Sequence, residues 1–140
     1  AIGCAQLESI SEILKKRKFV ELQYKKKLKT LKNLEIRTYK DWCRPVSWLI
    51  TVRLKTKQFN LRNKLIYFLQ SKGIDARPMI RPVHEAKHFK KYFNKNRYPN
   101  SSVQSATSFH LPSSPNLSLK KIDYVCRQVG LFIKKNEKKF

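Results

Sequence analysis

A chain of 140 residues with 41% hydrophobic content can form one domain with a buried core and is too short for two ordinary domains. Its 32 lysines and arginines outnumber its 9 aspartates and glutamates, which gives a formal net charge of +23. No apolar run approaches the roughly 18 residues that a membrane span needs, so no membrane is expected among the partners. The sequence opens inside a helical pattern at Ala1 without a signal peptide, which predicts a fragment of a longer protein.

Cysteine usage indicates the compartment. Cys4, Cys43 and Cys126 are far apart, odd in number, and form neither a CxxC pair nor a cluster with histidine. This pattern argues against a disulfide framework and favours a reducing, cytoplasmic setting in which each cysteine acts as a small apolar residue.

The positive charge is also typical of nucleic-acid binders, because neutralising phosphates drives their non-specific affinity. Lysines dominate the excess, however, and the sequence contains no zinc-finger spacing and no arginine-centred readout motif. The charge therefore predicts at most weak, non-specific nucleic-acid binding. A basic nucleic-acid-binding domain stays open as the alternative function.

The first half of the chain predicts one long helix followed by a strand. Between Cys4 and Lys32 apolar residues recur at helical spacing, with neither glycine nor proline to interrupt them. Residues 34–45 are expected to be irregular. Alternating polarity from Trp48 to Leu54 then predicts a strand with one buried face. Trp42 and Trp48 are interpreted as packing residues.

The middle of the chain predicts a second helix and an extended loop. Asn60 is expected to cap the helix, and Gly73 to end it in a left-handed conformation. A brief strand is expected over residues 74–77. Pro78 and Pro82 then favour an extended loop, because proline restricts its own backbone and that of the preceding residue.

The last third predicts a short aromatic-basic helix around His88 to Phe93, a polar stretch over residues 98–102, and a turn at residues 111–115. Ser118 is expected to cap a final amphipathic helix, followed by a frayed tail from Lys134. The predicted fold class is α+β, a single domain over residues 1–140. It consists of a small, mainly antiparallel sheet packed by one long N-terminal helix and further helices.

Four stretches resemble, in order, the C-terminal part of DegT/StrS aminotransferases. They are Ala1–Glu8 (AIGCAQLE), Trp48–Leu54, Gly73–Pro78 followed by Pro82-Val83-His84, and Leu111–Ser118 followed by Ile122–Val125. Each stretch is short, but together they keep family-like order and spacing over nearly the whole chain. The sequence is therefore identified as similar to the small domain of this family. Ile80 and Arg81 depart from the pattern, which commonly has aromatic or apolar residues there.

The resemblance implies a fold-type-I enzyme that passes an amino group from glutamate, through pyridoxal phosphate (PLP), to a nucleotide-linked keto-sugar. In that family an N-terminal large domain carries the PLP-binding lysine and the carboxylate that pairs with the pyridine nitrogen. The implied partners are this large domain, a homodimer partner and the nucleotide-sugar. No catalytic residue is expected in the chain, and by itself it is expected to be inactive and to bind no PLP.

The loop from Arg77 to His84 is the candidate substrate-binding site. The guanidinium groups of Arg77 and Arg81 can pair with phosphate or carboxylate oxygens. The resemblance places His84 where it could hydrogen-bond a sugar hydroxyl or the nucleotide. In the alternative interpretation Arg77 makes an internal ion pair and His84 packs at the end of the loop.

A less favoured alternative is a zinc peptidase. The string His84-Glu85-Ala86-Lys87-His88 matches the HExxH pattern, which on a helix places two imidazoles on one face for a metal ion. Lys87 within the string and Pro82 just before it argue against such a helix. A third ligand would have to come from far away, with His110 or Glu137 as the candidates. Chance accounts for the string better than metal binding.

Overall fold

A computed structural model of the chain describes residues 1–89, 91–92 and 98–140. Its sheet contains β1 (Leu34–Ile36), β2 (Ile50–Leu54), β3 (Arg77–Pro78) and β4 (Ser108–Leu111). The strands lie in the order β1-β2-β4-β3, and every neighbouring pair is antiparallel. The small antiparallel sheet expected from the sequence is confirmed.

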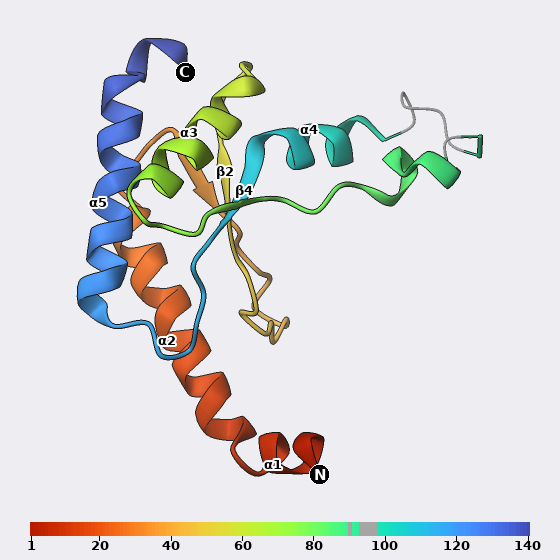
Figure 1. Ribbon diagram of the computed structural model, residues 1–140, viewed down its shortest axis with the longest axis vertical. Coiled ribbons are helices and arrows are strands. Elements are labelled where there is room, and N and C mark those ends of the chain that lie inside the picture. The colour runs from red at the N-terminus through yellow and green to blue at the C-terminus, as the bar shows by residue number, and fades with distance from the viewer. Residues whose placement is uncertain (90, 93–97) are drawn as a thin grey trace.

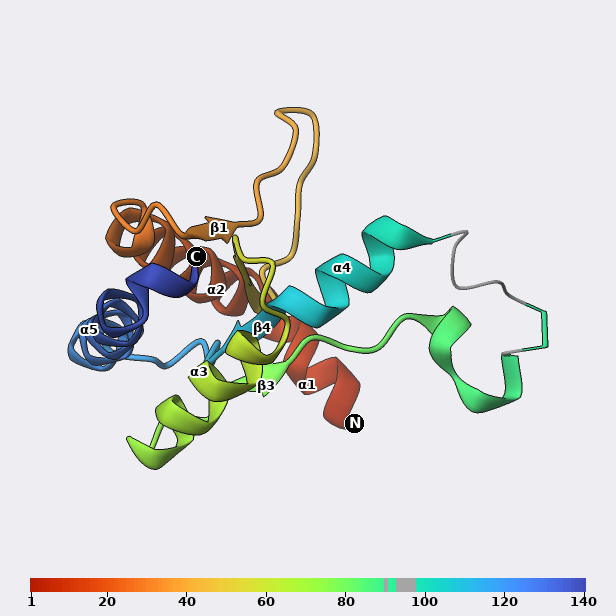
Figure 2. The same cartoon turned by 90° about the horizontal axis from the view of Figure 1, so that it is seen from above.

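The α-helices of the described residues are α1 (Ile2–Glu8), α2 (Ile10–Leu28), α3 (Asn60–Ser71), α4 (Pro99–Thr107) and α5 (Leu119–Lys135). Short 3-10 helices follow Pro82 (η1, Val83–Glu85), Ala86 (η2, Lys87–Phe89) and Asn136 (η4, Glu137–Lys139). Helices α2, α3 and α5 lie together on one side of the sheet, whereas α4 and the segment after β3 project from the opposite side (Figures 1 and 2). The α+β fold class is confirmed.

The core lies between the sheet and these three helices. Strand β2 alternates as predicted, with Ile50, Val52 and Leu54 buried and the residues between them half-buried. The helices contribute residues at helical spacing, among them Val20, Tyr24 and Leu28 from α2, Leu61, Leu65 and Leu69 from α3, and Ile122, Val125 and Val129 from α5. Burial of these side chains is the main source of stability for a domain of this size.

The prediction of one continuous N-terminal helix is wrong. The helix breaks at Ser9, whose φ of −104° and ψ of 8° leave the helical region, and α2 ends at Leu28. No residue of α1 is buried. Most helix stability in proteins comes from tertiary packing. Helix α1 has no buried residue, so packing does not keep it aligned with α2.

The local sequence pattern also failed to predict elements that are stabilised by residues distant in the sequence. Residues 34–45 were expected to be irregular, but β1 lies within them and pairs with β2. The polar stretch at residues 98–102 contains the start of α4, and β4 follows directly. The strand expected over residues 74–77 is reduced to β3. Trp42 and Trp48 are exposed, not packed.

Helix ends follow local chemistry more closely. Gly73 adopts the predicted left-handed conformation, with φ of 72°. Ser118 caps α5, and its side chain accepts a hydrogen bond from the backbone N–H of Lys121. Asn60 is not a cap but the first helical residue, after Phe59. In the tail, α5 continues through Lys135 and η4 follows it, so the segment after Lys134 is helical.

Candidate substrate-binding loop

The candidate loop starts at the edge of the sheet. After the turn at Gly73, β3 pairs with β4 and places Arg77 opposite His110. The N–H of Met79 donates to the carbonyl oxygen of Ser108 at 3.2 Å. Pro82, with φ of −59° and ψ of 143°, keeps the chain extended until η1. The prediction of an extended loop is confirmed, and the sheet holds its first residues.

Arg77 lies exposed at this edge. Its guanidinium group pairs with the carboxylate of Asp75, with Nε and Oδ1 3.1 Å apart and a second bond to Oδ2 at 3.1 Å. The pair is well exposed to solvent, and hydrogen bonding to Asp75 raises the pKa of Arg77. The internal ion pair considered in the sequence analysis is present. An exposed pair of this kind contributes little stability, so it can open to an incoming anion at small cost.

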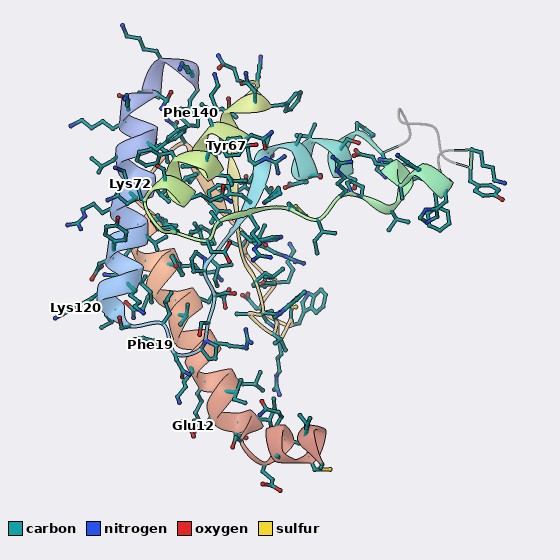
Figure 3. The ribbon with its side chains drawn as sticks, in the orientation of Figure 1. Glu12, Phe19, Tyr67, Lys72, Lys120 and Phe140 are labelled. Atoms are coloured by element: carbon teal, nitrogen blue, oxygen red, sulfur yellow. The ribbon has the colours of Figure 1, made fainter. Side chains whose placement is uncertain are left out.

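Arg81 is exposed and lines a cleft of about 720 Å³ between α3, the loop and α4. Polar and aromatic side chains dominate the other walls, among them Arg62, Tyr67, Gln70, Glu85 and Ser102. Tyr67, labelled in Figure 3, is 71% exposed on α3. A cleft with two guanidinium groups and an open aromatic ring can bind a phosphate-bearing ligand.

Arg62 is a cleft residue that the sequence analysis did not single out. Its Nη1 donates to the carbonyl oxygens of Ser105 and Ser108, at 3.2 and 3.0 Å, and so joins α3 to the α4–β4 connection. Its Nε is buried without a hydrogen-bond partner in the part of the chain described, and burial lowers the pKa of Arg62. Arg62, Ile66 and Gln70 line the cleft together and recur every four residues on α3, and this helical spacing was the available signal.

His84 does not line the cleft but packs against α4. It is only 9% exposed, and its ring stacks on that of Tyr98 with 4.8 Å between centroids. Its Nε2 lies 3.2 Å from the hydroxyl of Ser102, which donates to Oε1 of Glu85 at 3.1 Å. The geometry makes His84 an anchor between loop and helix. Its expected contact with a sugar hydroxyl stays a prediction.

The open face of the sheet lies on the other side of the loop. Here Thr51 Oγ1 and His110 Nδ1 are 3.1 Å apart, and Arg53 forms an ion pair with Glu35. Burial lowers the pKa of His110, which favours its neutral imidazole. Met79 lines two smaller clefts on this face as well as the one containing Arg81. The loop therefore borders clefts on both sides.

Metal binding is not favoured by this geometry. His84 and His88 lie on separate 3-10 helices, and Ala86 between them is extended, with φ of −67° and ψ of 137°. The imidazoles therefore do not share one face of an α-helix. Within residues 1–89, 91–92 and 98–140, no three His, Cys, Asp or Glu side chains are grouped to hold a metal ion. The expected helix around His88 is reduced to η2, and Phe93 lies outside the described residues.

The lysines that the structure describes do not offer PLP a desolvated attachment point. The cofactor forms its covalent bond with a lysine that is desolvated in a pocket. No lysine in the described ranges is buried, and the half-buried Lys25 and Lys27 are held in ion pairs with Glu21 and Asp123. We therefore assign no role in PLP chemistry to the described lysines.

Known proteins share this sequence pattern. The family model described as the DegT/DnrJ/EryC1/StrS aminotransferase family matches residues 1–130. The GDP-perosamine synthase of Escherichia coli O157:H7 is 27% identical over 132 residues, which are 94% of this chain and 35% of that protein. The GDP-perosamine synthase of Caulobacter vibrioides is 38% identical over 85 residues, which are 60% of this chain and 23% of that protein. The chain spans about a third or less of these curated relatives.

Solved structures share the fold. The aminotransferase PseC of Helicobacter pylori, involved in the biosynthesis of pseudoaminic acid, superposes with a TM-score of 0.85 at 18% identity, over 95% of this chain and 36% of that chain. The E. coli GDP-4-keto-6-deoxy-D-mannose-3-dehydratase with bound hydrated PLP has a TM-score of 0.77 at 20% identity, over 91% and 33%. With four ordered motifs and a matched model over most of its length, the chain belongs to the DegT/DnrJ/EryC1/StrS aminotransferase family.

Proposed function

We propose that this chain is the small domain of a PLP-dependent nucleotide-sugar aminotransferase and acts together with a PLP-binding large domain, within a homodimer in the cytoplasm. The family match over residues 1–130 is the observation that carries the proposal. The relatives named as GDP-perosamine synthases support a nucleotide-linked sugar as the substrate class. PLP, when bound by the large domain, supplies the electron sink for amino transfer.

In this proposal the loop binds and orients the substrate. Arg81 is exposed in the cleft and pairs with a phosphate oxygen of the nucleotide. Arg77 contributes a second positive charge when its ion pair with Asp75 opens and its guanidinium group binds the ligand instead. His84 holds the loop on α4 through Ser102 and orients any hydroxyl that reaches it. None of these residues transfers a proton in the reaction.

An assay of amino transfer tests the proposal. The longer polypeptide that contains this chain and a large domain, supplied with PLP, glutamate and a nucleotide-linked keto-sugar, should release the amino sugar. The 140-residue chain alone should not, and borohydride reduction after PLP addition should leave no single lysine specifically modified. A specifically modified lysine in the chain alone, or an inactive longer polypeptide, would contradict the proposal.

Substitution of Arg81 distinguishes a role in substrate binding from a role in the chemical step. In the longer polypeptide, Arg81→Ala should raise KM for the nucleotide-sugar by about ten- to a hundredfold, the usual loss for one charge-assisted contact, with kcat nearly unchanged. Lys64→Ala, an exposed cation on α3 outside the cleft lining, is the matched control. If the two substitutions change KM equally, Arg81 does not contact the substrate.

A further inference from the structure

The outward side of α2 combines cations with exposed apolar side chains. Six exposed positions recur at helical spacing and therefore share one side of the helix: Lys15, Lys18, Phe19, Leu22, Lys26 and Lys29. Phe19 is 44% and Leu22 51% exposed, on the side of the helix opposite the buried Val20, Tyr24 and Leu28. This side presents apolar surface among cations, not a purely solvated face.

Helix α5 continues this surface. It packs along α2, where Lys27 forms an ion pair with Asp123, and Leu31 in the turn after α2 lies beside Gly130. Its exposed side again alternates cations and apolar groups at helical spacing: Lys120, Tyr124, Arg127, Leu131 and Lys134. Figure 3 shows Lys120 at the start of α5, pointing away from the body of the domain. We call these two exposed stripes the α2–α5 face.

An apolar groove opens beside this face, between α3 and α5. Its volume is about 790 Å³, and Phe68, Leu131 and Phe132 form its apolar lining. The rings of Phe68 and Phe132 lie 5.6 Å apart, and Leu131 is 52% exposed. Lys72, Lys134 and Lys135 are exposed at its rim, with Lys72 Nζ 5.9 Å from the ring centroid of Phe68. Apolar lining and a cationic rim match an anionic amphiphile.

The charge of the α2–α5 face is not neutralised within the domain. No lysine or arginine of its two stripes forms an ion pair with another described residue. The acidic side chain at the seam, Asp123, is already paired with Lys27. Such an unpaired cationic surface favours a partner that brings many negative charges.

We propose that the α2–α5 face and its groove dock on an anionic phospholipid surface. The lysines and arginine attract the headgroups, and Phe19, Leu22 and Leu131 enter the interface between headgroups and acyl chains. The groove favours a lipid surface over nucleic acid, because phosphate backbones need no apolar lining. This contact is peripheral: within the described residues no helix is long and apolar enough to cross a membrane. It revises the expectation, drawn from the absence of a span, that membranes are not among the partners.

Vesicle co-sedimentation tests this docking and needs neither PLP nor substrate, so it is independent of the proposed function. The chain should sediment with vesicles of phosphatidylcholine and phosphatidylglycerol, much less with phosphatidylcholine alone, and binding should weaken as salt rises. Replacing Lys120, Arg127 and Lys134 together with Gln should lower the vesicle affinity by about a hundredfold, since each cation near an anionic surface contributes about 1 kcal/mol. The matched control replaces Lys55, Lys57 and Lys64, which are exposed elsewhere, with Gln and should change it severalfold at most.

A separate variant tests the contribution of the apolar groove. Leu131→Asn keeps every charge, so it should weaken vesicle binding about fivefold while leaving binding to a single-stranded oligonucleotide unchanged. Circular dichroism of each variant checks that it is folded. Absence of vesicle binding, equal loss in the two triple variants, or an unaffected Leu131→Asn variant would each overturn the proposal. If the Leu131→Asn variant is unaffected and the chain binds the oligonucleotide as tightly as it binds vesicles, the face binds polyanions in general and not lipid in particular.

Discussion

Two leucines on one helix allow a direct test of the described core. Leu28 of α2 is 2% exposed inside the core cluster, whereas Leu22 on the outward side of the same helix is 51% exposed. Leu28→Ala removes about 2.4 kcal/mol of transfer free energy, at about 0.8 kcal/mol for each buried methyl or methylene group. The remaining cavity adds to this loss, so we expect a destabilisation of about 3–4 kcal/mol.

Leu22→Ala is the matched control, because it deletes the same atoms from the same helix. With half of the side chain in water and no cavity left behind, it should cost about 0.5 kcal/mol or less. Urea unfolding followed by circular dichroism measures both variants, with a shared m-value as the sign that only stability has changed. If both cost the same, the outward side of α2 is covered in solution. If Leu28→Ala costs under about 1 kcal/mol, the described packing of α2 is wrong.

The remaining predictions need only the same chain. Gly73→Ala should lower the unfolding free energy by about 1–2 kcal/mol, because φ of 72° strains a residue with a Cβ; no loss would mean that the turn relaxes. Ile2→Lys should cost under about 0.5 kcal/mol at a site 84% exposed, and a larger loss would mean that α1 is packed. Burial raises the pKa of Cys126 to about 12, so an alkylating agent should modify exposed Cys4 rapidly and Cys126 only after unfolding, as followed by mass spectrometry. The unfolded chain releases the Cys126 proton near the ordinary pKa of 9.0, so this thiol should lower stability as pH rises from 9.0 toward 12 and leave it unchanged below, whereas Cys126→Ala should lack that dependence. Oligonucleotides should bind weakly, without sequence preference, and with affinity falling steeply as salt rises; tight binding to one sequence would refute this.

Features that depend on neighbouring residues could be predicted from the sequence. The alternation of β2 follows from the two-residue repeat of a strand, and the stripe of α5 with its Ser118 cap follows from helical spacing. The turn at Gly73 was predictable because only glycine adopts a positive φ without strain. The ordered motifs that identify the family are likewise short runs of sequence, and the matched model confirms them.

Features that depend on distant partners were decided only by the tertiary structure. Strands β1 and β4 are too short to be recognised by pattern, because their stability comes from pairing with β2 across the sheet. The break at Ser9 reflects the absence of packing on α1, which the apolar spacing of its residues does not reveal. The candidate loop residues are close in sequence, but Arg81 lines a cleft with Arg62 of α3 while His84 is fixed on α4. Which side chains meet depends on how helices and strands pack, and local sequence does not encode those distances.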